Sequence, residues 1–136
     1  MNRKSTLLLF CLVSLLIMLT VSCKNKGDDD AVKPASDLKG TSKGTATNKA
    51  NNADKKALSI NITSTDNPIA GTYTLVNATG KLSGSVLGLI INLTLKPDAT
   101  GTTYTFSGSA DTNIITGTMT GVESTSTVVY DVVLTK

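Results

Sequence analysis

The sequence predicts an all-β domain over residues 58–136, built as a small antiparallel barrel or, as the alternative, a β-sandwich of seven or eight short strands. Apolar residues alternate with polar ones along most of this region, which is the period of a strand with one buried face. Threonine, which strands favour, is abundant. Turn residues recur at intervals of about eight to twelve positions, and no segment repeats its apolar residues at helical spacing.

Each expected strand is marked by its alternating apolar residues. The turns between strands are richest in Asp, Asn, Pro and Gly at residues 66–68, 77–80 and 97–101. In chain order, the strands are marked by Leu58, Ile60 and Ile62; Tyr73 and Leu75; Leu82 and Val86; Leu89, Ile91, Leu93 and Leu95; Tyr104 and Phe106; Ile115 and Met119; and Val128, Tyr130, Val132 and Leu134.

Three of these strands carry a glycine between two hydroxyl residues and two apolar ones, at residues 82–86, 106–110 and 115–119. The glycines Gly84, Gly108 and Gly117 therefore share the inward face with the apolar side chains. Glycine weakens a strand unless backbones approach closely, the strand coils sharply or an aromatic ring covers it. We expect such a structural role, with a ligand pocket left by the missing side chains as the alternative.

Residues 1–22 have the pattern of an export signal. Arg3 and Lys4 precede an apolar run over residues 7–21, which is shorter than the roughly 20 apolar residues of a membrane-spanning helix. The run ends in Leu19-Thr20-Val21-Ser22-Cys23, which resembles the lipobox of bacterial lipoproteins, with Thr20 where Leu is usual. The resemblance implies that residues 1–22 are a lipoprotein signal peptide and that Cys23 becomes an N-terminus lipidated with chains such as palmitate. A plain secretory signal or an uncleaved anchor is the alternative.

Residues 23–57 are expected to be the lipidated cysteine and a disordered polar tether. Val32 and Leu38 are the only large apolar residues between positions 24 and 57, too few to offset the entropy of ordering the chain. The acidic cluster at residues 28–30 resembles the surface-export signal of Bacteroidetes lipoproteins, although it also fits an ordinary solvated charge run. The expected location is the bacterial envelope, at the outer membrane, with surface display as the further implication of the acidic cluster.

Gly71-Thr72-Tyr73 at the start of a strand, followed by the glycine-centred strands, is similar to avidin-like and lipocalin-like barrels. Tyr73 stands where those families have a tryptophan, and the chain contains no tryptophan. The resemblance implies a barrel rather than a sandwich, and none of the families' ligand residues carries over.

The composition excludes several chemistries. After Cys23 there is no histidine, cysteine or arginine, which removes the Ser-His-Asp and Cys-His nucleophile systems and the usual zinc sites. Residues 58–136 carry three lysines and five acids, so a basic nucleic-acid footprint is absent. We expect no cofactor and no metal. A glycosidase with paired carboxylates is the enzymatic alternative, and it requires two of the five acids to converge in a cleft.

The predicted function is non-enzymatic binding of a protein or glycan by a membrane-anchored β-domain, through its loops or its hydroxyl-rich strand face. Its speculative binding residues are Tyr73, Tyr104, Phe106 and Tyr130. A specific version is a surface proteinase inhibitor that presents Asp66-Asn67-Pro68 or residues 123–126.

Two further functions compatible with the composition require particular structural features. A carrier of a small apolar ligand requires an internal cavity lined by Tyr73, Leu93, Phe106 and Met119. A structural envelope or matrix subunit requires an unpaired apolar edge, expected along residues 127–135.

Overall fold

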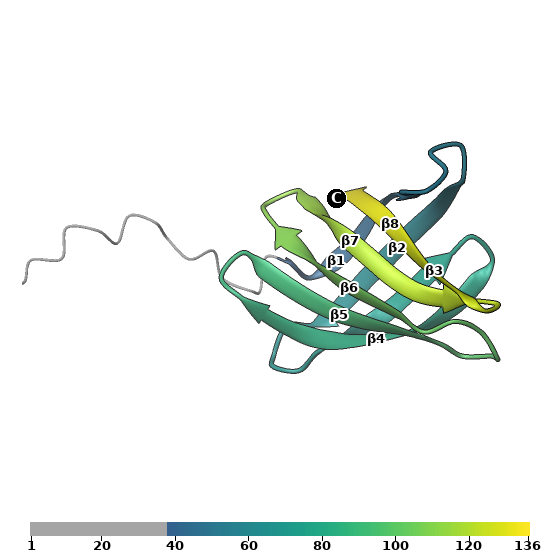
Figure 1. The fold of residues 1–136 in the computed structure, drawn as a ribbon. Helices are drawn as coiled ribbons and strands as arrows, with labels where there is room; N and C mark the ends of the chain where they lie inside the picture. Colours follow the sequence, from purple (N-terminus) through teal and green to yellow (C-terminus); the bar gives the residue numbers. More distant parts are fainter. Residues whose placement is uncertain (1–37) are drawn as a thin grey trace, which may run out of the picture. The chain divides into compact units, whose positions relative to one another are not determined.

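The computed structural model describes residues 38–136, which form one closed barrel of eight antiparallel strands (Figure 1). The strands are β1 (Gly40–Asn48), β2 (Lys55–Ser64), β3 (Ile69–Leu75), β4 (Ala78–Leu87), β5 (Ile90–Pro97), β6 (Tyr104–Ala110), β7 (Ile114–Glu123) and β8 (Ser126–Thr135). Each strand pairs with the next in the chain, and β8 pairs with β1 to close the barrel. The predicted small antiparallel barrel is thus confirmed, and the sandwich alternative is wrong.

The strand β1 lies where the sequence predicts a disordered tether. It is paired along both sides, with β2 and with β8. The boundary that places a tether over residues 23–57 and starts the domain at residue 58 is therefore wrong for residues 40–57. The predicted signal peptide (residues 1–22), Cys23 and residues 24–37 lie outside the described part of the chain.

The reason for this error is the size of the inward-facing side chains of β1. Ser42 and Ala46 are buried and Gly44 lies between them on the same face. An added Cβ at Gly44 would collide with the backbone of Val133 in β8. Strand β1 thus packs close to its neighbour with small residues, and its alternation contains no large apolar residue that a sequence pattern could reveal.

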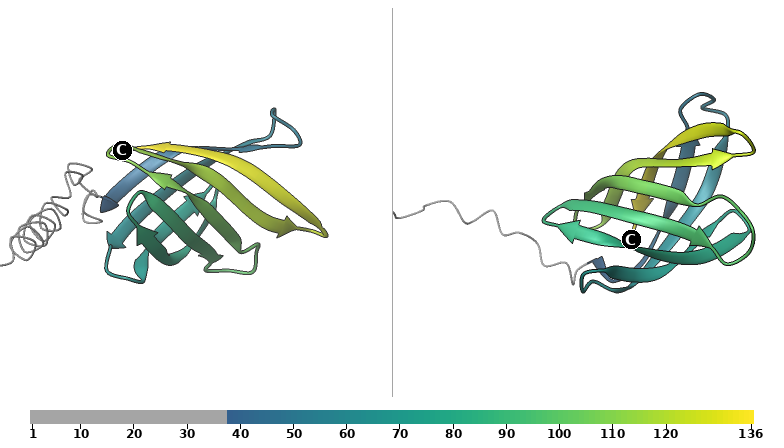
Figure 2. Two further views of the ribbon diagram at one scale, coloured as in Figure 1. Left: turned by 60° about the vertical axis from the view of Figure 1, so that its left-hand side comes forward. Right: turned by 60° about the horizontal axis from the view of Figure 1, so that its bottom comes forward.

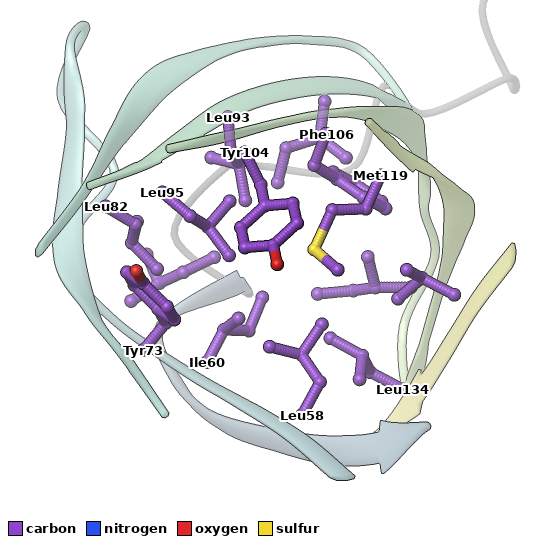
Figure 3. Close-up of a cluster of buried hydrophobic side chains, with 14 of the residues drawn as sticks. Leu58, Ile60, Tyr73, Leu82, Leu93, Leu95, Tyr104, Phe106, Met119 and Leu134 are labelled. Atoms are coloured by element: carbon purple, nitrogen blue, oxygen red, sulfur yellow. The ribbon is translucent and has the colours of Figure 1, made fainter. Parts of the chain in front are cut away.

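The barrel interior is filled by the side chains of alternate residues, which point towards the axis (Figure 3). Met119, Ile91 and Tyr130 are completely buried. The cavity that remains between the central side chains, among them Leu58 and Phe106, measures about 10 Å³, which is about the space that one water needs. The enclosed chamber that the carrier alternative requires is therefore absent from the described barrel. Its expected lining residues Tyr73, Leu93, Phe106 and Met119 are packed core residues.

The inward-facing glycines have the structural role that the sequence predicts. A Cβ at Gly84 would collide with the backbone of Asn92, and one at Gly117 would collide with the backbone of Ser107. Aromatic rings cover others: the Phe106 ring lies against Gly108 and Gly117, the Tyr73 ring against Gly80 and the Tyr104 ring against Gly121. The missing side chains therefore allow close backbone approach and make room for rings inside the barrel.

The two ends of the barrel differ in their connections (Figures 1 and 2). One end, which we call the mouth end, carries the connections at residues 49–54, 76–77, 98–103 and 124–125. The opposite end, which we call the terminal end, carries the start of β1, the C-terminal residue Lys136 and the connections at residues 65–68, 88–89 and 111–113. The chain therefore enters and leaves the barrel at the end remote from the mouth.

Closure also removes the edge that a structural subunit would use. Strand β8 pairs with β7 from Ile114↔Thr135 to Glu123↔Ser126 on one side and with β1 on the other. The unpaired apolar edge that the structural-subunit alternative requires along residues 127–135 is therefore not present in β8. Within residues 38–136, no helix is long and apolar enough to cross a bilayer.

Candidate functional site

Four polar or aromatic residues at the mouth end continue the inward-facing rows of the core. Lys56 stands two positions before Leu58 in β2, and Glu123 stands two positions after Gly121 in β7. Tyr104 and Tyr130 occupy the inward face of β6 and β8. Because alternate residues of a strand share a face, all four side chains converge at the same end of the barrel interior. We call Lys56, Tyr104, Glu123 and Tyr130 the Glu123 cluster.

The carboxylate of Glu123 organises this cluster through one oxygen atom. Its Oε1 accepts hydrogen bonds from Lys56 Nζ at 2.6 Å, from Tyr104 Oη at 2.5 Å and from Tyr130 Oη at 2.8 Å. Lys56 Nζ also lies 4.6 Å from the centroid of the Tyr130 ring, within the range of a cation–π contact. The Tyr104 and Tyr130 rings meet edge to face with their centroids 6.3 Å apart. Lys56 and Glu123 thus compensate each other's charge at the edge of the apolar core.

The surroundings of the cluster shift the pKa values of Glu123 and Lys56 in the directions that keep both groups charged. Burial alone would raise the pKa of Glu123, but the hydrogen bonds from Lys56, Tyr104 and Tyr130 outweigh it and lower this pKa. Burial alone would lower the pKa of Lys56, but its contacts with Glu123 and Tyr130 raise it. Burial and the nearby Glu123 carboxylate raise the pKa of Tyr104. At neutral pH, Glu123 is therefore an anion, Lys56 a cation and Tyr104 a neutral hydroxyl donor.

Above this cluster the mouth end opens into a cleft of about 480 Å³, a volume in the range of small-ligand sites, roughly 300–1,000 Å³. We call it the mouth cleft. The connections at residues 76–77 and 98–103 contribute to its walls, and Asp98 N donates a hydrogen bond to Thr79 O of β4 at 3.0 Å. Its lining is drawn from Lys56, Tyr73, residues 75–79, residues 97–102, Tyr104, Glu123 and Ser124.

Backbone strain is concentrated at the rim of the mouth cleft. Val76 has a φ of 55° and Ser124 a φ of 57°, and both line the cleft. A β-branched residue is rarely found in this left-handed region. The N–H of Val76 is held there by the carbonyl of Ala57 at 2.9 Å. Val76 and Ser124 each stand first in a two-residue hairpin turn, 76–77 and 124–125, and a positive φ is the conformation that such turns require.

The structure separates the four speculative binding residues into two groups. Tyr73 and Tyr104 line the mouth cleft, and Tyr130 lies directly beneath it in the Glu123 cluster. Burial of the Tyr73 hydroxyl, and to a lesser extent the negative charge of Asp98, raises the pKa of Tyr73. Phe106, in contrast, is a core residue that packs against Gly108 and Gly117.

The two loops expected to serve a proteinase inhibitor lie at opposite ends of the barrel. Asp66-Asn67-Pro68, with a cis Asn67–Pro68 bond, belongs to the terminal end. Residues 123–126 form a tight turn with only Ser124 and Thr125 between the strands, and Glu123 points into the cluster. Neither segment is an extended loop that projects from the mouth.

The pairing of Lys56 with Glu123 is not predicted by the sequence. Lys56 falls in the predicted tether, and Glu123 falls in the polar segment 121–127, whose one large apolar residue is Val122. The apolar–polar alternation does place Lys56 and Glu123 on the inward face, because each is separated by an even number of positions from the buried residues of its own strand. What the pattern does not reveal is that both strands end at the same side of a closed barrel.

A second, shallower groove of about 350 Å³ lies on the outer surface of β4–β7. Its outward-facing side chains are hydroxyls and one amide, and Ser107 Oγ donates to Asn92 Oδ1 at 2.8 Å. This is the hydroxyl-rich strand face that the sequence predicts as the second possible contact surface. It has no charged residue in its lining, and its one aromatic lining residue, Phe106, is buried.

Replacing Glu123 should destabilise the barrel. We expect Glu123→Gln to lower the free energy of unfolding by about 1–3 kcal/mol, because hydrogen bonds to a charged group are lost and the partly buried Lys56 keeps no anionic partner. Urea unfolding of the chain from Lys24 onward measures this loss. The matched control is Asp131→Asn, which breaks the more exposed ion pair of Asp131 with Lys49 and should cost at most about 1 kcal/mol.

The same pair of proteins tests the pH dependence. Folding lowers the pKa of Glu123 below its ordinary value of 4.5. The stabilisation that the Glu123 carboxylate contributes is therefore present above pH 4.5 and is lost as the pH falls through the lowered pKa of the folded state. The difference in unfolding free energy between the wild type and Glu123→Gln should therefore shrink as the solution is acidified below pH 4.5. An equal difference at neutral and at strongly acidic pH would contradict this electrostatic account of the cluster.

The donor set restricts the chemistry of the mouth cleft. Among residues 38–136 no group of three or more His, Cys, Asp or Glu side chains is arranged to hold a metal ion. Two carboxylates, Asp98 and Glu123, line the cleft, but three donors stabilise the charge of Glu123. The arrangement is therefore suited to hydrogen bonding with a polar ligand.

No protein-family model matches this chain, and no curated protein or solved structure is significantly similar to it.

Proposed function

We propose that the chain is a lipid-anchored lipoprotein of the bacterial outer membrane that binds a glycan in its mouth cleft without transforming it chemically. The observation that carries this proposal is the position of the cleft: it opens at the end of the barrel remote from the point where the chain enters. A domain anchored through Cys23 would present this end away from the membrane. Display on the outer face of the cell belongs to the same proposal.

The lining of the cleft supports a glycan as the partner. Asn77, Asp98 and Thr100 provide amide, carboxylate and hydroxyl groups, which complement sugar hydroxyls as donors and acceptors. The positive charge of Lys56 is compensated by Glu123 at 2.6 Å, so the floor offers no unpaired charge for a strongly ionic ligand. A cleft of this size encloses a short segment of a chain, whereas a typical protein partner covers about 800 Å² of surface.

A binding measurement tests the proposal. The wild-type protein should bind members of a panel of neutral oligosaccharides, with heat release detected by titration calorimetry. Asp98→Ala should weaken this binding about 10- to 100-fold, because a hydrogen bond to a charged group contributes about 1.5–3 kcal/mol. Asp131→Asn, on the outer face, should leave the affinity unchanged.

The outcome also separates the glycan from a protein partner. If no oligosaccharide binds, and a photoreactive residue at position 77 instead crosslinks to an envelope protein in living cells, the glycan proposal is wrong. A protein partner would then be the occupant of the same cleft.

Glycoside hydrolysis is the second candidate, because Asp98 and Glu123 meet in one cleft. A retaining or inverting glycosidase uses such a pair, with one carboxyl protonated as the general acid. The lowered pKa of Glu123 disfavours that role for this residue. Incubation with the bound oligosaccharide should therefore release no reducing ends, and a release that Glu123→Gln abolishes would establish the enzyme instead.

A further inference from the structure

The hairpin between β4 and β5 has an apolar tip, at the terminal end of the barrel. Leu87 is 80% exposed, Leu89 48% and Ile90 57%. Leu87 and Ile90 are directly paired across the two strands, so their side chains share the outer face. Leu89 belongs to the two-residue turn between them. Three exposed apolar residues thus lie next to one another at the tip of this hairpin, and we call them the hairpin patch.

The fold does not require apolar residues at this tip. The tight turn is made by Gly88, whose φ of 60° is the conformation that glycine supplies in two-residue hairpins. The neighbouring position is normally filled by a polar residue. Among the connections between the eight strands, residues 88–89 form the one without a polar side chain. Contiguous exposed apolar residues indicate an interaction surface.

We propose that this patch is a membrane-contact site, in which Leu87, Leu89 and Ile90 insert into the interface of the bilayer that holds the anchor. This inference rests on the proposed function, since it assumes that Cys23 carries lipid. The neighbouring hairpin adds Ile114, which is 47% exposed at the same end. The contact would hold the barrel upright, with the mouth cleft directed away from the membrane.

The position of the patch relative to the anchor supports a bilayer as the occupant. Fourteen residues, 24–37, separate Cys23 from the start of the described chain, and they reach at most about 50 Å when fully extended. The chain joins the barrel at the terminal end, where the patch also lies. A tethered contact of this kind is effectively intramolecular, so even a small apolar surface is occupied at high local concentration.

A second copy of the chain is a weaker candidate for the occupant. A stable protein interface has about 20–30 residues on each side, whereas this patch has three, or four with Ile114. Interfacial membrane contact requires much less, because a few apolar side chains that enter the headgroup region contribute through their burial.

The test uses the lipidated full-length protein, purified from bacterial membranes and reconstituted into vesicles of phosphatidylethanolamine and phosphatidylglycerol. The predicted processing removes Cys11 and modifies Cys23, which leaves a single new cysteine as the only free thiol. Leu89→Cys places an environment-sensitive fluorophore on the hairpin, and Thr125→Cys places the same fluorophore at the mouth end as the matched control. Lipids with brominated chains then quench any fluorophore that reaches the membrane.

We expect bromolipids to remove about half of the emission from position 89, because interfacial residues reach roughly 5–10 Å into the boundary of headgroups and chains. Emission from position 125 should not change. Adding Leu87→Asp and Ile90→Asp should abolish the quenching at position 89 while the protein still floats with the vesicles.

Three contrary results would each contradict the proposal at a distinguishable point. If the protein floats with vesicles but position 89 is not quenched, the hairpin contact is wrong and the lipid anchor stands. A blue-shifted but unquenched fluorophore at position 89 identifies a second copy as the occupant and overturns membrane contact. If the protein does not float at all, the lipid anchor itself is wrong and the membrane-contact site fails with it.

Discussion

A chain that begins at Leu58 should fail to fold. This truncation removes β1, which pairs with both β2 and β8 and closes the barrel. It also opens the interior beside Ile60, Val132 and Leu134, which are at most 3% exposed in the closed barrel. Each such side chain contributes roughly 1.5–3 kcal/mol through burial, so the combined loss reaches the total stability of a small domain, about 5–15 kcal/mol.

Urea unfolding followed by circular dichroism measures this effect. The chain that begins at Lys24 is the control and should unfold in one cooperative transition. The chain that begins at Leu58 should show no cooperative transition and should aggregate through the unpaired edges of β2 and β8. A cooperative transition of the shorter chain with a similar midpoint would contradict the pairing of β1 in a closed barrel.

The second large effect is expected for Gly84→Ala in β4. An added Cβ would overlap the backbone oxygen of Asn92 and would lie 2.9 Å from the Cα of Leu93, so two paired strands would have to move apart. Backbone cannot yield as a flexible side chain can. Overpacking of this kind costs about 1–3 kcal/mol and sometimes more. We therefore expect a fall in unfolding free energy in this range, measured by urea denaturation.

The matched control is Gly101→Ala in the connection between β5 and β6. A Cβ there meets only the Pro97 ring, at 3.4 Å, and the change should alter stability by no more than about 0.5–1 kcal/mol. Equal stability of the two variants would show that Gly84 is dispensable and that the close approach of β4 and β5 is not fixed by glycine.

The core strands could be predicted because their large apolar residues show which positions of each strand face inward. Ile91, Leu93 and Leu95 alternate and are buried as expected. Leu89, at the start of the same pattern, belongs instead to the turn and is 48% exposed. Apolar alternation alone does not locate the end of a strand, because an exposed leucine in a turn continues the same pattern as a buried one.

Several features required information about long-range pairing. Strand β1 has small inward residues such as Ala46, and only its contacts with β2 and β8 identify it as part of the barrel. Lys56 and Glu123 are 67 positions apart in the chain, and their ion pair depends on barrel closure. Tyr73 and Tyr104 could be named as binding candidates from residue type, but their shared cleft depends on the connections at residues 76–77 and 98–103.

The tyrosines provide the most direct test of glycan binding in the mouth cleft. The chain contains three tyrosines and no tryptophan; Tyr73 and Tyr104 line the mouth cleft, and Tyr130 lies in the Glu123 cluster beneath it. Intrinsic fluorescence therefore reports on this site alone. Titration of the wild-type protein with an oligosaccharide that binds in calorimetry should give a saturable change in tyrosine emission. The dissociation constant from this change should equal the one from calorimetry. Saturable binding that leaves all tyrosine emission unchanged would contradict the assignment of the mouth cleft as the binding site.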